Sequence, residues 1–179
     1  MLRCYVTDRR RGDVISAAKR AVETGINMIQ VREKDLEARA LFDLVRTIVK
    51  IAEGSQTQVL VNDRLDVALA AGAAGVHLPA DGLPAVEVRP FVKLVGVSTH
   101  SVEDVRQAAA SGADFTVFGP VFDTPGKVPV GIERLRAAVA CAPIPVLAIG
   151  GITLENAQEV IEAGAAGFAA IRLFQGGEN

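Results

Sequence analysis

The chain has 179 residues, half of them apolar, so it is long enough to bury a complete core. Its net charge of -2 gives no general attraction for nucleic acid, and a chain with no Trp and one Tyr has few surfaces on which bases could stack. No apolar stretch approaches the roughly 18 residues of a membrane span, and Cys4 and Cys141 form no CxxC pair, so we expect a single cytoplasmic domain over residues 1–179 with reduced thiols and no membrane partner.

Short apolar runs alternate with segments of helical period along the whole chain. The runs are almost continuously apolar, which is typical of parallel strands covered on both faces. Residue spacing in segments such as 41–51 predicts the intervening helices, and Asp13, Ser101 and Thr153 stand where helix N-caps belong. The expected strands are Leu2–Thr7, Met28–Val31, Val59–Val61, Gly75–Leu78, Leu94–Val97, Phe115–Phe118, Val146–Ile149 and Gly167–Ile171.

A four-residue pattern containing glycine recurs before every second expected strand. Its glycines are Gly25, Gly72, Gly112 and Gly164, each at the end of a helical segment, where a left-handed C-cap is common. This spacing of about two strand–helix units favours a closed barrel over an open sheet. We therefore predict an α/β fold, a (β/α)8 TIM barrel with short loops. Because the chain stops soon after the eighth strand, the eighth helix is expected to be truncated or absent.

Catalytic residues of this barrel fold gather at the C-terminal ends of the strands and in the loops that follow. After the second expected strand, Gln30 and Arg32 share one face, and Lys34 continues the row into the loop. An amide, a guanidinium and an ammonium in one row suit a phosphate group of high charge. The alternative is a solvated run of charges.

Polar residues also follow the third and fourth strands. Asn62 and Asp63 could bind Mg²⁺ and a phosphate oxygen, or could simply cap the next helix. His77 lies inside a buried-strand pattern, where a hydrogen-bonded core histidine is more common than a catalyst. Asp81 is expected on the rim.

The last four strands end in a second group of candidates. Ser98 and His100 follow the fifth strand, and the loop over residues 119–127 ends in Lys127 after a Gly-containing tip, a composition that suits phosphate. Gly150 and Gly151 follow the seventh strand, and Arg172 follows the eighth, where barrels of this kind commonly bind phosphate, although paired glycines can also be purely structural. Two anion sites would suit an enzyme that joins two phosphorylated substrates.

At these positions the chain resembles the superfamily of thiamine phosphate synthase and thiazole tautomerase, and is closest to the synthase. The similarity runs from Tyr5 to Ile171. The motifs that carry it are Gln30-Val31-Arg32-Glu33-Lys34, Val61-Asn62-Asp63, Gly75-Val76-His77-Leu78, Gly96-Val97-Ser98-Thr99-His100, Gly119-Pro120-Val121-Phe122-Asp123-Thr124 and Ala148-Ile149-Gly150-Gly151-Ile152.

The resemblance implies a transferase that condenses hydroxymethylpyrimidine pyrophosphate with hydroxyethylthiazole phosphate and releases pyrophosphate. It implies that Asp63 binds Mg²⁺, with Asp81 as a further candidate ligand. Residues implied for the pyrimidine pyrophosphate are Gln30, Arg32, Lys34, Asn62, Ser98 and Lys127, of which Arg32, Lys34, Ser98 and Lys127 would be catalytic. Residues implied for the thiazole phosphate are Thr124, Gly126, Gly150, Gly151, Ile171 and Arg172.

Three positions depart from the pattern of the synthase. Gly82 stands where the family has a second carboxylate for Mg²⁺, Gly126 replaces a hydroxyl in the loop after the sixth strand, and Arg172 replaces a serine. Pro79 is also found in the tautomerase branch, which would need a proton carrier such as His77 or His100. The alternatives are therefore a thiazole tautomerase or a non-catalytic ligand sensor, and a truncated eighth helix could leave an apolar stripe for a homo-oligomer.

Overall fold

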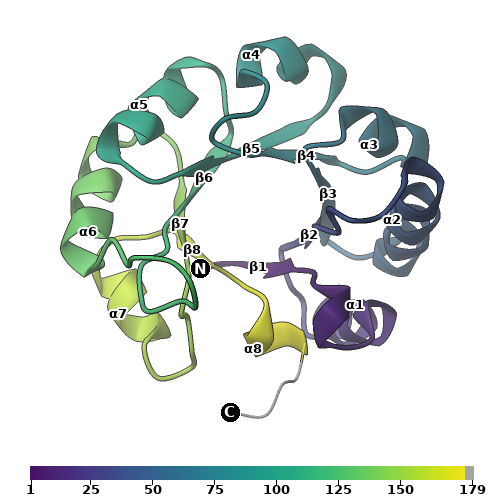
Figure 1. Cartoon of the computed structure of the whole chain (residues 1–179), viewed down its shortest axis with the longest axis horizontal. Coiled ribbons are helices and arrows are strands. Elements are labelled where there is room, and N and C mark those ends of the chain that lie inside the picture. The colour runs from purple at the N-terminus through teal and green to yellow at the C-terminus, as the bar shows by residue number, and fades with distance from the viewer. Residues whose placement is uncertain (176–179) are drawn as a thin grey trace.

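The computed structural model describes residues 1–175, and over this range the chain forms a (β/α)8 barrel. Eight parallel strands are hydrogen-bonded in chain order and close between the first and the last (Figure 1). The strands are β1 (Leu2–Val6), β2 (Met28–Val31), β3 (Gln58–Asn62), β4 (Gly75–Leu78), β5 (Leu94–Thr99), β6 (Phe115–Phe118), β7 (Val146–Ile149) and β8 (Gly167–Ala170). The predicted fold and all eight predicted strands are confirmed.

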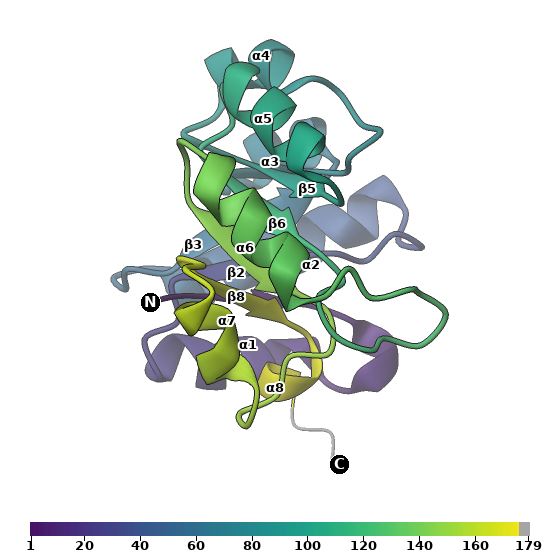
Figure 2. The same cartoon turned by 90° about the vertical axis from the view of Figure 1, so that its left-hand side faces the viewer.

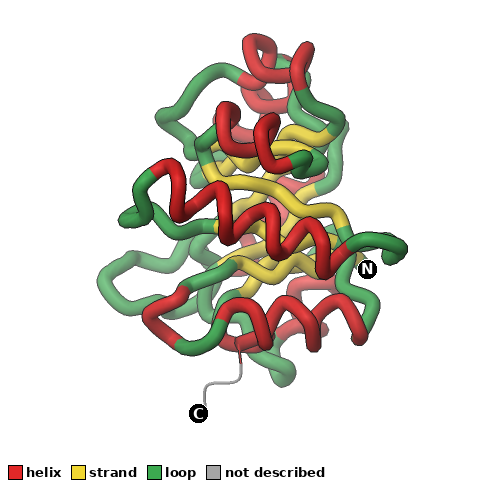
Figure 3. The backbone as a smooth tube through the Cα atoms, turned by 90° about the vertical axis from the view of Figure 1, so that its right-hand side faces the viewer, coloured by secondary structure: helices red, strands yellow, loops and turns green. Residues whose placement is uncertain are grey.

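The helices form a ring outside the strands (Figure 1), and the side view shows helices lying across the outer face of the strands (Figure 3). They are α1 (Val14–Glu23), α2 (Ala38–Ala52), α3 (Leu65–Ala71), α4 (Ala85–Val88), α5 (Val102–Ala110), α6 (Ile132–Cys141), α7 (Ala157–Glu162) and α8 (Arg172–Gln175), with 3-10 turns η1 (Arg9–Arg11) and η2 (Arg89–Phe91). No helix among the described residues is both long and apolar enough to cross a membrane.

Alternation along each strand separates two apolar layers. One set of side chains packs against the helices, and the opposite set fills the barrel as a single buried cluster. The buried members of that inner cluster are Cys4, Val6, Met28, Leu60, Phe115, Val117, Leu147 and Ala169. This apolar cluster fills the interior of the barrel. Polar side chains that could bind a ligand therefore lie beyond it, at the C-terminal ends of the strands.

The local signals at helix ends are mostly confirmed. Asp13 accepts the N–H of Ile15 at 2.9 Å, and Ser101 forms a full capping box at α5. The four repeated glycines all have positive φ, from 69° to 93°, as left-handed C-caps require.

Thr153, a predicted N-cap, is not the N-cap of α7 itself but caps the turn that leads into it, and its carbonyl accepts the Ala157 N–H at 3.0 Å. Helix α7 begins four residues later, after an N-cap at Asn156. Thr153 instead exchanges hydrogen bonds with Asn156 across the preceding turn, with donor–acceptor distances of 2.9 and 3.3 Å. A hydroxyl that bonds locally can stabilise a turn as readily as a helix start.

Within the described residues, α8 forms a single turn, and it covers the seam between β8 and β1. The Phe174 ring lies 6.0 Å from that of Tyr5 and 6.3 Å from that of Phe168. Tyr5 and Phe168 are buried beneath it. The apolar stripe expected on this face for a partner subunit is therefore covered within the chain.

Neither cysteine forms a disulfide. Cys4 lies inside the barrel, where burial raises the pKa of its thiol to about 12, so it stays protonated and unreactive. Cys141 is half-buried at the end of α6.

Candidate active site

The candidate residues of β2 to β5 meet at the C-terminal end of the barrel through side-chain hydrogen bonds. Gln30 is 3 % exposed, on the inner face of β2, and its Nε2 donates to Oδ1 of Asn62 at 3.1 Å. This bond satisfies part of a buried amide that otherwise interrupts an apolar strand. The predicted pairing of the β2 and β3 candidates in one place is therefore present in the structure.

Ser98 on β5 is joined to His77 on β4. The His77 ring is buried, and its Nε2 lies 2.9 Å from Oγ of Ser98. Burial, with the nearby charge of Arg32, lowers the pKa of His77 to about 4, so the imidazole is neutral at pH 7. His77 is thus a hydrogen-bonded core histidine, as the strand pattern indicated, and it fixes the orientation of the Ser98 hydroxyl.

His100 lies apart from this pair, at the entrance to α5. Its side chain is exposed enough to reach solvent, and Nδ1 lies 2.6 Å from the carbonyl oxygen of Gly119 at the end of β6. The ring therefore ties the loop after β5 to the loop after β6.

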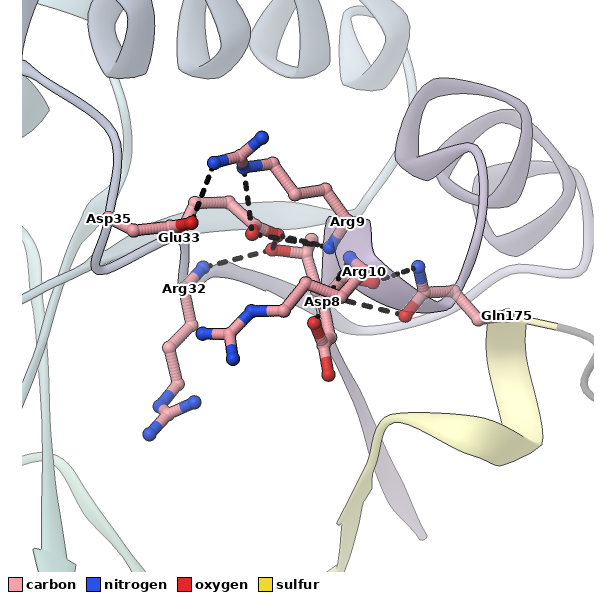
Figure 4. A network of polar contacts seen from close by, with 8 residues as sticks. Asp8, Arg9, Arg10, Arg32, Glu33, Asp35 and Gln175 are labelled. Atoms are coloured by element: carbon pink, nitrogen blue, oxygen red, sulfur yellow. Dashed lines mark hydrogen bonds and ion pairs between the residues drawn. The ribbon is translucent and has the colours of Figure 1, made fainter.

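Glu33 is a functional candidate that our sequence reasoning missed. Its side chain is only 2 % exposed, although it stands between Arg32 and Lys34 in the charged run. It accepts hydrogen bonds from the Thr7 hydroxyl at 2.6 Å and from the backbone N–H of Arg9 at 3.1 Å. Figure 4 shows the Arg32 side chain pointing away from this cluster. A solvated run of charges is therefore the wrong interpretation at Glu33.

Asp63 does not cap the helix that follows it. The N-cap of α3 is Arg64, which makes no side-chain capping bond. Asp63 has a left-handed backbone with φ 62°, which is uncommon outside glycine, and its N–H donates to the His77 carbonyl at 3.0 Å. No hydrogen bond or ion pair to its carboxylate is formed by residues 1–175. The carboxylate is thus exposed and available to a ligand.

A cleft of about 250 Å³ lies beside Asp63, between the loops after β2 and β3. Lys34 and Asn62 also line this cleft. Three predicted site residues from the ends of β2 and β3 and the loops that follow therefore face one space. Its complete lining is Val31, Glu33, Lys34, Leu36, Leu41, Asn62, Asp63 and Arg64.

The loop after β4 has no room for a side chain at Gly82. A Cβ added there would lie 2.8 Å from Cδ of Pro79, whose carbonyl also accepts the Gly82 N–H at 3.0 Å. Pro79 and Gly82 therefore form one tight turn, and a carboxylate at residue 82 would require a different loop. Asp81 is exposed on this turn, on the rim as expected. Within residues 1–175, no cluster of three or more His, Cys, Asp or Glu residues has the geometry of a metal site.

The loops after β6 and β7 pack against each other through their backbones. Val121 and Phe122 donate N–H groups to the carbonyls of Ile149 and Gly150 at 2.8 and 3.1 Å. A Cβ at Gly150 would lie 2.4 Å from Cβ of Pro120 and 3.1 Å from the Thr124 hydroxyl oxygen. Close packing is thus one reason for glycine at this position, and it brings Thr124 beside the end of β7.

Gly151 is constrained in the same way. Its φ is 65°, and an added Cβ would lie 2.7 Å from the carbonyl oxygen of Asp123. No acceptor among residues 1–175 takes the N–H of Gly150 or Gly151. The structural role of these glycines is therefore compatible with the predicted role in phosphate binding, which would use the two N–H groups.

Lys127 and Gly126 lie on the loop between β6 and α6, which projects from the C-terminal end of the barrel (Figure 2). A turn closes its tip, since the Lys127 N–H donates to the Thr124 carbonyl at 3.0 Å. Ile171 packs at the edge of the inner barrel cluster, and Arg172 is exposed at the start of α8. Within residues 1–175, no salt bridge occupies Arg32, Lys34, Lys127 or Arg172.

Comparison with known proteins identifies the family. A family model described as thiamine monophosphate synthase matches residues 4–174. The chain belongs to the thiamine monophosphate synthase family. A relative from Geobacter sulfurreducens is 43% identical over 93% of this chain and 83% of its own. The thiamine-phosphate synthase of Roseiflexus castenholzii is 40% identical over 93% of this chain and 77% of its own.

A solved structure extends the comparison to three dimensions. The thiamine phosphate pyrophosphorylase from Pyrococcus furiosus has a TM-score of 0.91 and 36% sequence identity, covering 99% of this chain and 88% of its own. The family match runs from β1 into α8, so it includes every strand end described above. The similarity of this thiamine monophosphate synthase family member to its relatives is therefore a property of the whole barrel and not of one motif.

Proposed function

We propose that the protein is a thiamine-phosphate synthase, a transferase that joins hydroxymethylpyrimidine pyrophosphate to hydroxyethylthiazole phosphate. The observation that carries the proposal is the set of cationic and amide side chains at the ends of β2 and β3, within a family of that name. In the reaction, the bond from the pyrimidine methylene carbon to the pyrophosphate oxygen breaks. A bond from the thiazole nitrogen to that carbon forms, and pyrophosphate leaves.

Stabilisation of the leaving pyrophosphate is the main catalytic task. Negative charge accumulates on it as the carbon–oxygen bond breaks, and fixed positive groups lower the barrier most where charge develops. Arg32 and Lys34 supply this charge from β2 and its loop, and Lys127 supplies it from the projecting loop. Gln30 and Asn62, already hydrogen-bonded to each other, hold the pyrimidine pyrophosphate through their remaining amide donors.

Ser98 orients the pyrimidine, and His77 holds Ser98. A neutral imidazole at 2.9 Å can accept the Ser98 proton or donate to its oxygen, so it fixes the hydroxyl without adding charge.

Asp63 would hold Mg²⁺. The fit rests on its exposed carboxylate, which no residue in the range 1–175 pairs with, and on its left-handed backbone beside the cleft. Mg²⁺ commonly takes one or two carboxylates together with phosphate oxygens and waters, and it would neutralise pyrophosphate charge when bound. Asp81 would join only after movement of the turn formed by Pro79 and Gly82.

The thiazole phosphate would bind on the opposite side of the barrel mouth. The N–H groups of Gly150 and Gly151 can donate to its oxygens, and the Thr124 hydroxyl lies beside them. Arg172 adds a full positive charge where a hydroxyl would suffice. Gly126 and Ile171 would complete the surface that faces the thiazole.

Turnover with the two substrates tests this proposal directly. Purified protein with Mg²⁺ should release one pyrophosphate for each thiamine phosphate formed. Asp63→Asn should remove the dependence of pyrimidine pyrophosphate affinity on Mg²⁺, as measured by calorimetry with and without chelator. Equal affinity of the wild-type protein in Mg²⁺ and in chelator, with no turnover, would sink the synthase proposal. Interconversion of thiazole carboxylate phosphate tautomers would then be the reaction to assay.

A further inference from the structure

A buried acidic residue lies next to the arginine that the mechanism uses. Glu33 directs its carboxylate away from the barrel mouth, into the space between the loops after β1 and β2 (Figure 4). Burial of an unpaired carboxylate is costly, and here the cost is offset by hydrogen bonds from the Thr7 hydroxyl and the Arg9 N–H, at 2.6 and 3.1 Å. The Arg9 guanidinium lies 3.8 Å from the carboxylate and pairs at 2.7 Å with Asp35.

Thr7 connects this cluster to the backbone of Arg32. The Thr7 N–H donates to the Gln30 carbonyl at 3.0 Å, which continues the pairing of β1 with β2. Two residues after Gln30, the Arg32 N–H donates to the Thr7 hydroxyl oxygen at 3.0 Å. The hydroxyl thus extends the sheet by one bond beyond the last residue of β2, at Val31. Because its own proton goes to Glu33, the oxygen is oriented to accept from Arg32.

We propose that Glu33 is a positioning residue, which acts through Thr7 to hold Arg32 as a continuation of β2 and to aim its guanidinium into the barrel mouth. The inference rests on the proposed function, since it assigns Arg32 to the pyrophosphate. The cation that Glu33 faces is Arg9, on its outer side at 3.8 Å, and not Arg32. An arginine whose backbone is held but whose guanidinium is unpaired keeps its full charge for an anionic ligand.

Variants at Thr7 and Glu33 test the connection. Thr7→Val keeps the shape but removes the hydroxyl and both of its hydrogen bonds, to Glu33 and from the Arg32 N–H, and should raise the KM for pyrimidine pyrophosphate about tenfold. Thr7→Ser should restore the wild-type value. Glu33→Gln, which removes the charge, should raise the same KM about fivefold. The KM for thiazole phosphate should stay within twofold in all three variants.

A matched control uses the other carboxylate on Arg9. Asp35 lies on the same loop but its side chain is 48% exposed, and it does not contact Thr7. Asp35→Asn should leave both KM values within twofold of wild type. If Asp35→Asn and Glu33→Gln have the same effect, the general charge of the loop matters and the positioning role of Glu33 is wrong.

A double-mutant cycle separates positioning from general stability. In an Arg32→Ala background, Glu33→Gln should no longer change pyrimidine pyrophosphate affinity, because there is no guanidinium left to position. An equal loss in both backgrounds would overturn the proposal. Thermal unfolding of each variant identifies any that fail to fold, and Thr7→Ser provides a folded comparison.

The binding of inorganic pyrophosphate with Mg²⁺ gives a readout that does not need turnover. Calorimetry should show the same ranking of variants, with Thr7→Val weakest. If wild-type protein binds pyrophosphate but makes no thiamine phosphate, the proposed function fails while the positioning of Arg32 can still be measured. If turnover is normal and Thr7→Val binds pyrophosphate like wild type, the positioning proposal fails alone.

Discussion

The two sides of the barrel mouth are built in different ways. Between β1 and β2, β2 and β3, and β4 and β5, the strand ends are joined by contacts between side chains: Thr7 with Glu33, Gln30 with Asn62, and His77 with Ser98. From β6 to β7 the loops are joined mainly by backbone hydrogen bonds and by glycines too close to their neighbours to carry a Cβ.

This difference separates two kinds of sensitivity. The side-chain half depends on protonation and on single functional groups, which pH and single substitutions can change. The glycine half depends on the path of the backbone, which does not change when a side chain gains or loses a proton. Substitutions and pH changes should therefore act on one half at a time, and the predictions below test that separation.

Adding a methyl group should disrupt the glycine half most strongly. A Cβ at Gly150 would lie 2.4 Å from Pro120, on a backbone with φ 97°, so Gly150→Ala should destabilise the fold by about 3 kcal/mol or more. Gly126→Ala is the matched control, because Gly126 also has positive φ, of 76°, but open space around it. It should cost only about 1–2 kcal/mol. Urea unfolding measures both, and equal losses would show that strain, not packing, controls this half.

Acid should weaken the side-chain half through His77. The folded protein keeps His77 neutral down to about pH 4, whereas the unfolded chain takes up a proton near pH 6.5, so protons favour unfolding between these values. The contribution is complete above pH 6.5 and is lost as pH falls toward 4, by at most about 3 kcal/mol. His77→Gln keeps a hydrogen-bonding group for Ser98 but cannot titrate. Its unfolding free energy should fall less between pH 6.5 and 4.5 than that of wild type, and parallel curves would contradict this account.

Removal of Lys127 should affect the reaction but not the fold. A charge-assisted contact to departing pyrophosphate is worth about 1.5–3 kcal/mol, so Lys127→Ala should lower kcat more than tenfold. Its side chain lies exposed on the projecting loop, and thermal unfolding should be unchanged. Wild-type kinetics in a folded Lys127→Ala protein would remove this residue from the site.

The smallest expected effect concerns Arg172. Arg172→Ser should raise the KM for thiazole phosphate about fivefold, the effect expected of one exposed charge on a ligand phosphate. The KM for pyrimidine pyrophosphate should not change if the two halves bind separate anions. Equal losses for both substrates would mean that Arg172 is structural or that the two anion sites are one.

The sequence predicted those parts of the molecule that follow from local pattern. Apolar runs located all eight strands, and glycines at helix ends marked the C-caps, because both depend on a few adjacent residues. Gln30 was identifiable as a site candidate because an amide inside a buried strand needs a partner. The partner itself, Asn62, lies 32 residues away and was matched only through the barrel topology.

The features that sequence reasoning missed depend on contacts distant along the chain. Glu33 looks like one member of a charged run until Thr7 and the Arg9 N–H, 26 and 24 residues earlier, are placed beside it. Likewise, Gly82 looked like a lost ligand, whereas the structure explains it by its contact with Pro79. One available signal was alternation just beyond β2, since residues 32 and 33 face opposite sides where the chain continues extended from the strand.

The side-chain amide of Gln175 forms hydrogen bonds with the backbone of the loop after β1, as a neighbouring strand would. Its Oε1 accepts the Asp8 N–H at 3.2 Å, and its Nε2 donates to the Asp8 carbonyl at 2.8 Å, across a sequence separation of 167 residues. During synthesis on the ribosome, this loop emerges long before α8 and cannot be fastened until α8 has left the exit tunnel. A nascent chain that stalls before α8 is made would therefore present the β1 loop with its backbone still open to water.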